Sequence, residues 1–240
     1  LAAEQGMVSA QRNMGIAYGT GKGVRLNYLE AIKWYTLAAN QGDIIAQNNL
    51  GVIYINGLGV EKDYEEGIKW YERAANQGDA QSQYNLGLLY DVGRGVKQDY
   101  QVAIGWYKKA ASQGYAKAWF NLGGIYTTGV KGIERNYQEG LKWYMLAAEN
   151  GDAEAQNNVG IFFREGYGVK SDNVKAFKWW NLAAKQGHVL AQYNLAGLYY
   201  YGSGVKQNTE MATLWFRKAA EGGLEEAKLI LRKIKKQSVK

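Results

Sequence analysis

The stretch Asn48–Val60, NNLGVIYINGLGV, decides the fold of this 240-residue chain. Its last four residues, GLGV, are similar to a glycine loop that cradles phosphate. The pattern recurs, however, as YNLGLLYDVGRGV from Tyr84, NNVGIFFREGYGV from Asn157 and YNLAGLYYYGSGV from Tyr193. A phosphate loop follows a buried strand and occurs once or twice in a domain, whereas this pattern repeats with no strand before it. We therefore interpret its glycines as parts of a repeated architecture.

The repeat has a nearly constant length of 36 residues, extended once to 37. Stretches of this length signal stacked units, none of which buries its apolar face alone. We expect one solenoid domain over residues 1–240. Its predicted units are 1–42 (with a partial upstream helix at 1–6), 43–78, 79–114, 115–151, 152–187 and 188–223, followed by a cap helix and basic tail at 224–240.

The first half of each unit predicts a helix, which we call helix A. In the second unit Ala46, Leu50 and Tyr54 are four residues apart and therefore share one helical stripe. Gly51 lies beside this stripe, where glycine costs an isolated helix about 1 kcal/mol. We expect a neighbouring helix to approach closely there. The corresponding residues elsewhere are Gly15, Gly87, Gly123, Gly160 and Ala196.

The second half predicts another helix, helix B, which begins after an N-cap residue. Asp63 is followed by Glu66, the spacing of a capping box, and the same spacing occurs at Glu30 and Glu139. Trp70 and Tyr71 then precede Ala74 and Ala75 by four residues each. This constant spacing favours packing in the core over a stacking platform for sugars or bases. The predicted N-caps are Asn27, Asp63, Asp99, Asn136, Asp172 and Asn208, and the aromatic pairs begin at Trp34, Trp70, Trp106, Trp143, Trp179 and Trp215.

The connections between the helices also have recurrent residues. Gly57 and Gly59 are predicted to give the A-to-B connection positive φ angles, and Gly78 to end helix B. Asp79 and its counterparts Asp43 and Asp152 then stand where the next helix A needs an N-cap. We interpret His188, the only histidine, as a plain surface residue.

Composition narrows the classes of function. The chain is 47% hydrophobic and 21% charged, which is typical of a globular protein, and no apolar run approaches the length of about 18 residues that spans a bilayer. With no cysteine and one histidine, we expect no thiolate or multi-histidine metal site and no cofactor. The net charge of +7 arises largely from the C-terminal end, so we expect no nucleic-acid partner. We favour a solvated helix end there, with contact to an acidic partner or anionic lipid as the alternative; its basic residues are Lys228, Arg232, Lys233, Lys235, Lys236 and Lys240.

Units of the form AQxNLGxxYxxGxGVxxDxxxAxxWYxxAAxQG resemble Sel-one-like repeats, the slightly longer relatives of tetratricopeptide repeats. The resemblance covers residues 1–223 and implies an all-α, right-handed α/α superhelical solenoid of about six helix-turn-helix repeats plus a C-terminal capping helix. The fourth unit departs from it at Gly129–Ile133, where one residue is inserted. Penicillin binding and hydrolysis have been proposed for cysteine-rich members, but this chain lacks their cysteines, which weakens that implication.

The start of the chain matches the end of a helix B, because Leu1–Gly6 corresponds to Leu37–Gly42. We therefore expect a fragment of a longer protein in which an upstream unit covers Met7, Ile16 and Tyr18. The resemblance suggests a bacterial, exported setting, with any targeting signal upstream of Leu1.

By the same resemblance, the A helices line a concave groove, and their residues that differ between units are candidates for partner contact. One asparagine per helix A forms a row beside them, which either recognises an extended peptide backbone or, as we favour, links neighbouring repeats. The predicted groove residues are Arg12, Asn48, Asn49, Tyr84, Asn85, Phe120, Asn121, Asn157, Asn158, Arg164, Tyr193, Asn194, Tyr200 and Tyr201. A further variable row comprises Ile16, Val52, Leu88, Gly124, Ile161 and Gly197.

The predicted function is a scaffold or adaptor that binds a protein or peptide in this groove and catalyses no reaction. A β-lactamase-like enzyme and a cell-wall glycan binder are the alternatives. We expect the strongest contact near the sixth unit, where Tyr193, Tyr200 and Tyr201 lie on one helix A. Tyr200 and Tyr201 point about 100° apart, so one of them is expected to face the final helix.

Overall fold

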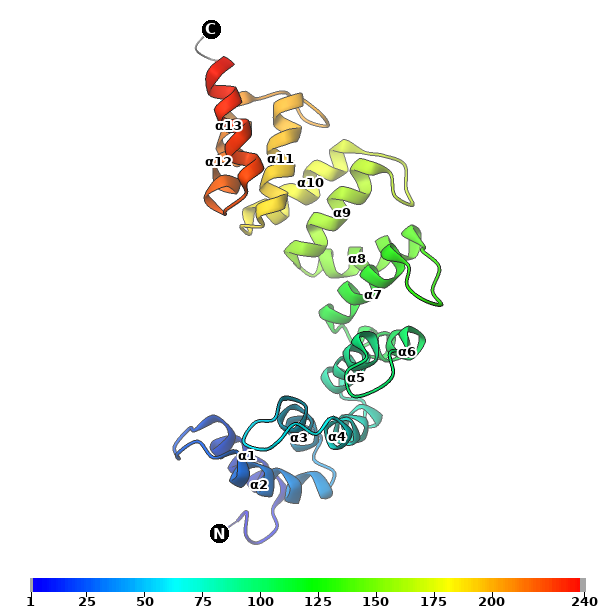
Figure 1. Cartoon of the computed structure of the whole chain (residues 1–240), viewed down its shortest axis with the longest axis vertical. Helices are drawn as coiled ribbons and strands as arrows, with labels where there is room; N and C mark the ends of the chain where they lie inside the picture. The colour runs from blue at the N-terminus through cyan, green and yellow to red at the C-terminus, as the bar shows by residue number, and fades with distance from the viewer. Residues whose placement is uncertain (1, 238–240) are drawn as a thin grey trace. The chain divides into compact units, whose positions relative to one another are not determined.

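The computed structural model describes residues 2–237 and confirms an all-α repeat fold (Figure 1). Its helices are α1 (Val8–Thr20), α2 (Tyr28–Asn40), α3 (Ile44–Asn56), α4 (Tyr64–Asn76), α5 (Ala80–Val92), α6 (Tyr100–Ala111), α7 (Ala116–Thr128), α8 (Tyr137–Glu149), α9 (Ala153–Glu165), α10 (Asn173–Lys185), α11 (Val189–Tyr201), α12 (Thr209–Glu221) and α13 (Glu225–Gln237). The odd-numbered helices from α1 to α11 are the predicted A helices, and the even-numbered helices from α2 to α12 are the predicted B helices. Helix α13 is the predicted terminal helix. Lys240 of the predicted basic tail lies outside the described residues.

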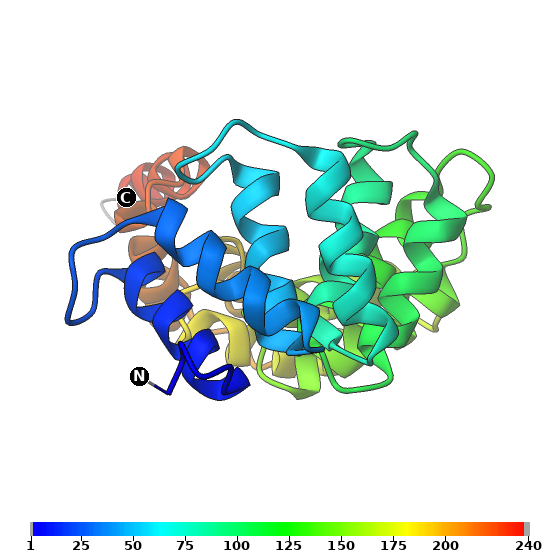
Figure 2. The same cartoon turned by 90° about the horizontal axis from the view of Figure 1, so that it is seen from below.

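The chain divides into two compact units, Leu1–Ala118 and Trp119–Lys240. Figure 2 shows helices of the first unit side by side, joined alternately by long loops, such as residues 21–27, and short turns, such as residues 41–43. The inserted residue of the fourth repeat falls in the second unit, where Val130 and Ile133 form an isolated β-bridge. The single solenoid domain over residues 1–240 stays a prediction.

In the first five repeats the A–B helix pair is held by close contact between a glycine and an aromatic ring. A Cβ atom placed on Gly51 would come 2.4 Å from Cδ1 of Tyr71, and one on Gly87 would come 2.6 Å from Cδ1 of Tyr107. These distances leave no space for a side chain, which confirms the predicted close approach. The same contact pairs Gly15 with Tyr35, Gly123 with Tyr144 and Gly160 with Trp180, while Ala196 and Phe216 are both buried at these positions in the sixth repeat.

The A-to-B loops are fixed by backbone geometry. Gly57 and Gly59 have φ angles of 68° and 72°, as predicted, and a Cβ on Gly59 would lie 2.5 Å from that of Tyr28 in the preceding repeat. Positive φ and this close approach both favour glycine. Asp63 caps α4 by accepting from the Glu66 N–H at 2.9 Å.

The reciprocal half of the predicted capping box does not form. The Asp63 backbone N–H, which a glutamate side chain would accept from, donates instead to the carbonyl of Tyr54 on the preceding helix A at 3.0 Å. The corresponding bonds run from Asn27 to Tyr18 and from Asn136 to Tyr126. Each loop is therefore tied back to its own helix A.

Buried glutamines join neighbouring repeats. Gln47 donates through Nε2 to the carbonyl of Ala39 at the end of α2 (3.0 Å), and its Oε1 accepts from Gln77 after α4 (2.7 Å). The last carbonyls of a helix have no partner within it, so Gln47 satisfies one of them. Gln11, Gln83 and Gln156 form the same two bonds, and Gln192 forms the first of them.

The N-caps of the A helices agree with the prediction for the aspartates and correct it for His188. Asp43, Asp79 and Asp152 accept from the backbone N–H three residues on, at 2.7–2.8 Å. His188 takes the same position, since its Nδ1 accepts from the Ala191 N–H at 3.2 Å. His188 is therefore a capping residue of α11.

The aromatic pairs of the B helices pack as predicted, although unequally. The second ring of each pair is buried: Tyr35, Tyr71, Tyr107, Tyr144, Trp180 and Phe216. Among the first rings, Trp70 and Trp215 are buried and the other four are half-buried. The indole of Trp70 lies 4.3 Å from the guanidinium carbon of Arg73, so an amphipathic side chain covers its outer face.

Replacing Gly87 by alanine tests the glycine–ring contact. We expect the overpacked methyl group to cost about 1–3 kcal/mol of unfolding free energy, despite the higher helix propensity of alanine. Gly105 on α6 is the matched control, because a Cβ there would meet nothing within 4 Å. Gly105→Ala should raise stability by up to about 1 kcal/mol. Urea unfolding of both variants measures the difference, and a Gly87→Ala protein as stable as the wild type would contradict the contact.

Candidate functional site

Two predicted contact residues of the first compact unit are engaged within the fold. Arg12 donates through Nη1 to Oδ2 of Asp43 at 3.1 Å, and so pairs with the N-cap of α3. Asn48 is buried and accepts at Oδ1 from the Ser82 hydroxyl at 3.0 Å. Both side chains connect one repeat to the next.

The asparagine row links repeats through the buried tyrosines. Asn49 is hydrogen-bonded to Tyr35, and Asn85 to Tyr71, in each case the ring of the preceding helix B. Asn158 bonds Tyr144 in the same way. These bonds favour the structural interpretation of the row over recognition of a peptide backbone.

The sixth repeat departs from this arrangement because Trp180, on the preceding helix B, stands where the first four repeats have tyrosine. The Trp180 indole donates to the backbone carbonyl of Asn157 at 3.1 Å. Asn194 has no tyrosine hydroxyl to bond at this position and donates instead to Oδ1 of Asn157 at 3.3 Å. Asn157 is therefore buried and engaged by its neighbours.

Two predicted aromatic contacts lie at the edge of the core. Tyr84 is half-buried, with ring centroids 5.7 Å from Tyr107 and 5.1 Å from Tyr115. Phe120 is half-buried against Tyr144 at 5.5 Å. Contacts within their own compact unit thus bury part of the surface of each ring. Asn121, also half-buried, lies next to Phe120 on α7.

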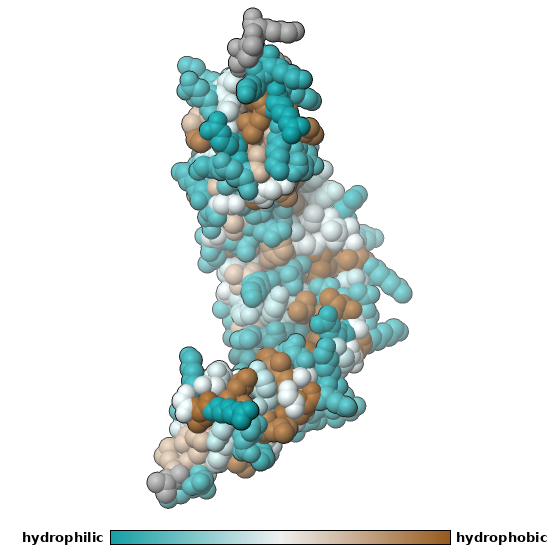
Figure 3. Space-filling model, turned by 60° about the vertical axis from the view of Figure 1, so that its left-hand side comes forward, coloured by the Kyte–Doolittle hydropathy of each residue, from teal (hydrophilic) through white to brown (hydrophobic). Residues whose placement is uncertain are grey.

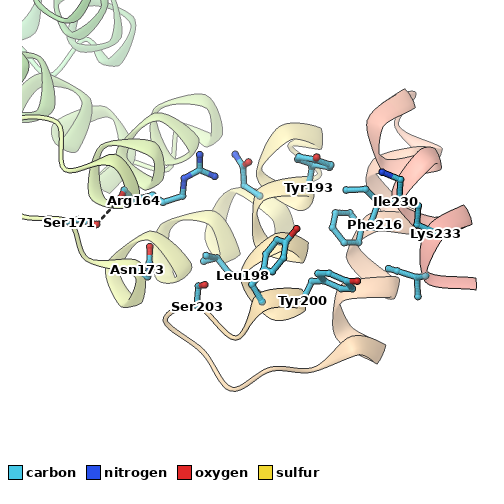
Figure 4. A pocket seen from close by; sticks show the side chains of 14 residues that line it. Arg164, Ser171, Asn173, Tyr193, Leu198, Tyr200, Ser203, Phe216, Ile230 and Lys233 are labelled. Carbon is cyan, nitrogen blue, oxygen red and sulfur yellow. Dashed lines mark hydrogen bonds between the residues drawn. The ribbon is translucent and has the colours of Figure 1, made fainter. Parts of the chain in front are cut away.

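The remaining predicted residues meet at one pocket of the second unit. The pocket has a volume of about 520 Å³ and extends from the end of α9 to α13 (Figure 4). Its lining includes the predicted Arg164, Tyr193, Asn194, Tyr200 and Tyr201. Figure 4 shows Arg164, Ser171 and Asn173 on one side and Tyr193, Phe216, Ile230 and Lys233 on the other, with Leu198, Ser203 and Tyr200 between them.

Aromatic rings form much of the pocket wall. Tyr193 meets Phe216 at 5.5 Å with a 64° angle between the rings, and Tyr200 meets Tyr201 at 5.0 Å and 86°. Tyr201 is 75% exposed, whereas Tyr200 packs against the core, as expected for neighbours on a helix. The pocket thus combines one solvent-facing ring with several rings that pack against the core.

Small side chains create the pocket. Gly197 stands where four other repeats have Ile16, Val52, Leu88 and Ile161, and a Cβ at Gly197 would meet nothing within 4 Å. Asn173 replaces the tyrosine that begins α2, α4, α6 and α8, and Ser203 replaces larger residues such as Tyr167. The sequence analysis placed Gly197 in a variable row but did not predict a cavity.

A smaller cavity of about 230 Å³ occupies the corresponding place in the first unit. Leu88, the counterpart of Gly197, lines it together with Tyr71, Asn85 and Val92. The exposed Leu88 and Val92 contribute apolar surface, but on the face shown in Figure 3 apolar patches are separated by hydrophilic ones. Apolar exposure therefore does not single out this cavity.

None of the helices within residues 2–237 has the length and apolar character needed to cross a membrane. In the same residues, no three side chains from His, Cys, Asp or Glu are grouped so that they could hold a metal ion.

A family model of the Sel1 repeat matches six consecutive segments, residues 8–43, 44–79, 80–115, 116–152, 153–188 and 189–224. The chain belongs to the Sel1 repeat family. The Sel1 repeat fold is commonly a protein-interaction scaffold, and its members are generally non-catalytic.

Two solved structures are similar to this Sel1 repeat chain. One is a protective antigen of uropathogenic Escherichia coli strains that displays an SLR fold, with 35% identity and a TM-score of 0.90; the match covers 97% of this chain and 50% of that one. The other is a Sel1 repeat protein from Oxalobacter formigenes, with 34% identity and a TM-score of 0.73 over 90% of this chain and 86% of that one. The Sel1 repeat chain thus spans about half the length of the Escherichia coli protein. Comparison with curated proteins gives no match.

Replacing Asn85 by alanine tests the role of the asparagine row in this Sel1 repeat protein. The change leaves the buried Tyr71 hydroxyl without its partner, which we expect to cost about 1–3 kcal/mol of unfolding free energy. In a Tyr71→Phe background the same change should cost much less. Asn13, the exposed counterpart on α1, is the control. Equal costs in both backgrounds would contradict the link between repeats.

Alkaline pH provides a second test of the buried tyrosines. Burial raises the pKa of Tyr35 to about 12, partly opposed by its hydrogen bond with Asn49, whereas an unfolded tyrosine has a pKa of about 10. The folded ring keeps its proton longer, so this contribution to stability is complete below pH 10 and is lost as the pH rises towards 12. We expect the Tyr35→Phe protein to be less stable than the wild type at pH 8. Between pH 10 and 12 its free energy of unfolding, measured by urea unfolding, should fall less than that of the wild type. An unchanged pH slope would contradict the assignment.

Proposed function

We propose that this Sel1 repeat protein is an interaction scaffold that binds a protein or peptide segment at the pocket between α9 and α13. The observation that supports this most is the convergence there of five predicted groove residues. Arg164, Tyr193, Tyr200 and Tyr201 were predicted from variation among the A helices, and Asn194 belongs to the constant asparagine row. Four of them come from one helix, α11, and Arg164 comes from the end of α9. Variation at positions that the repeat does not need for stacking is typical of a surface used for a partner.

The physical character of the pocket supports a binding role. Its volume of about 520 Å³ lies within the range of about 300–1,000 Å³ that is usual for ligand pockets. Apolar walls from Leu198 and Phe216 stand beside polar groups from Asn194 and Ser203. Such a combination provides area for affinity and a few hydrogen-bonding groups for orientation.

The proposal assigns no catalytic role to the chain. It has no cysteine, and its only histidine, His188, uses Nδ1 to cap α11. No contact in the pocket favours the alternative of a β-lactamase-like enzyme; incubation with a chromogenic β-lactam tests it, and turnover above buffer would contradict a scaffold-only function. A glycan would contact the same tyrosines of this pocket. Binding to a glycan array distinguishes this alternative from a protein-binding scaffold.

Tyr201 gives the clearest test of the proposal. Because its ring is 75% exposed and lines the pocket, Tyr201→Ala should weaken partner binding about tenfold or more while leaving the melting temperature unchanged. Tyr193→Ala should lower both, since Tyr193 also packs against Phe216. The partner is first captured from cells that express the full protein, and its affinity is then measured by titration calorimetry.

Tyr167 provides the control for that titration. It is also an exposed tyrosine of the second unit, but it stacks on Tyr137 away from the lining of this pocket. Tyr167→Ala should leave affinity unchanged. Full affinity in the Tyr201→Ala protein would place the contact elsewhere and overturn the proposed location.

A further inference from the structure

We infer that the pocket between α9 and α13 binds a peptide segment in which a large apolar side chain lies beside a carboxylate. This inference rests on the proposed scaffold function and specifies the chemistry of its partner. It follows from the origin of the cavity, from the side chains that form its wall, and from the sign of the charge around it.

The cavity is not required by the repeat fold. At the position of Gly197, the equivalent Leu88 lines a cavity of about 230 Å³ instead of about 520 Å³. Gly124 is the other glycine in this row, but there the Tyr144 hydroxyl lies 3.6 Å from where a Cβ would stand, whereas nothing lies within 4 Å at Gly197. Glycine inside a helix costs about 1 kcal/mol relative to alanine. No neighbouring side chain packs closely against Gly197 to offset this cost. The function of the glycine must therefore lie in the empty space that it leaves.

Apolar side chains from three helices line this space. Leu198 comes from α11, Phe216 from α12, and Ile230 and Ile234 from α13. Leu198, Phe216 and Ile234 are buried and belong to one core cluster, so the wall is fixed by packing behind it. A large apolar side chain placed here would exchange water contact for contact with a preformed wall, a favourable process of about 25 cal/mol per Å² of apolar surface.

The charge around the pocket is positive. Among the described lining residues Arg164 and Lys233 are charged, and none is Asp or Glu. Figure 4 shows these two side chains on opposite sides of the pocket, with Lys233 extending from α13. No carboxylate of the described residues forms an ion pair with Lys233, whereas Arg164 pairs with Glu165 outside the lining.

Arg164 retains donors despite that ion pair. Glu165 accepts through one oxygen from Nε and Nη2 of the guanidinium, which leaves the N–H groups of Nη1 unoccupied by this partner. Arginine and lysine only donate hydrogen bonds, so a ligand rich in acceptors suits both. A carboxylate provides such acceptors and a complementary charge.

The wall favours a peptide over a glycan. Tyr193 and Phe216 meet edge to face at 64° and Tyr200 and Tyr201 at 86°, so neither pair forms a flat platform of two coplanar rings. The aliphatic contribution of Leu198, Ile230 and Ile234 suits an amino-acid side chain. The carbonyl groups of a peptide backbone can also accept from Asn194 and Ser203 at the pocket.

The test begins with a displayed library of random twelve-residue peptides, panned on the whole chain. Peptides that bind are expected to contain Asp or Glu within a few residues of Trp, Phe, Leu or Met. The affinity of one synthetic peptide from this selection is then measured by fluorescence anisotropy for the wild type and four variants.

Gly197→Leu fills the cavity with the residue found at position 88. We expect it to weaken peptide binding at least tenfold without lowering the melting temperature, because the new side chain meets open space and raises helix propensity. Gly105→Leu is the matched control on α6, where a Cβ also meets nothing within 4 Å, and it should bind like the wild type. Comparing the two variants thus distinguishes an effect on peptide binding from an effect on folding.

Lys233→Gln should weaken binding about fivefold and reduce its salt dependence, because an electrostatic contact is screened by salt. Lys235→Gln on the same helix is the matched control, since Lys235 lines a different hollow between α12 and α13. It should change neither affinity nor salt dependence.

Each outcome decides between the two proposals. Selected peptides that bind Gly197→Leu as tightly as the wild type would overturn this inference and leave the scaffold function in place. Peptides without acidic residues, or affinity unaffected by Lys233→Gln, would overturn the predicted carboxylate. Failure to select any peptide would count against both the inference and the proposed function, and glycan binding abolished by Gly197→Leu would assign the pocket to a sugar instead.

Discussion

The contact between a glycine of helix A and an aromatic ring of helix B determines the geometry of the first five repeats. Without a Cβ on Gly51 or Gly87, the ring of Tyr71 or Tyr107 lies directly on the backbone of the facing helix. Tyr71 also reaches Asn85 of the next repeat through its hydroxyl. One side chain therefore sets both the distance within a helix pair and the link to the following pair.

Much of the fold could be predicted because its determinants recur in the sequence. The turn glycines, the N-caps and the small residue of helix A stand at constant spacing, and each has a local physical reason. Gln47 also recurs, in the AQxNLG motif, but its role could not be predicted, since its partners Ala39 and Gln77 lie 8 and 30 residues away and glutamine is an ordinary residue on a helix. The capping box at Glu66 failed for a related reason, because the carbonyl of Tyr54 competes for the same N–H group.

The candidate site was only partly predictable. Tyr193 and Tyr201 were recognisable as aromatic residues at variable positions, and both line the pocket. The cavity beside them depends on the small size of Gly197, Asn173 and Ser203, and a small residue in a sequence does not show whether a neighbouring side chain fills the space that it leaves. Lys233 was interpreted as part of a solvated basic end, because only the packing of α13 against α12 brings it to the pocket.

The glutamine and asparagine bonds between repeats also determine how far a perturbation travels. They join residues only 8 to 37 positions apart in the chain. Folding therefore requires no closure of long loops, whose entropic cost slows proteins with many distant contacts. Each repeat instead depends on its immediate neighbours, as expected for a linear array with nearest-neighbour coupling. Such an array can acquire a new recognition surface between two neighbouring repeats by changing three side chains, because the remaining repeats keep their own local contacts.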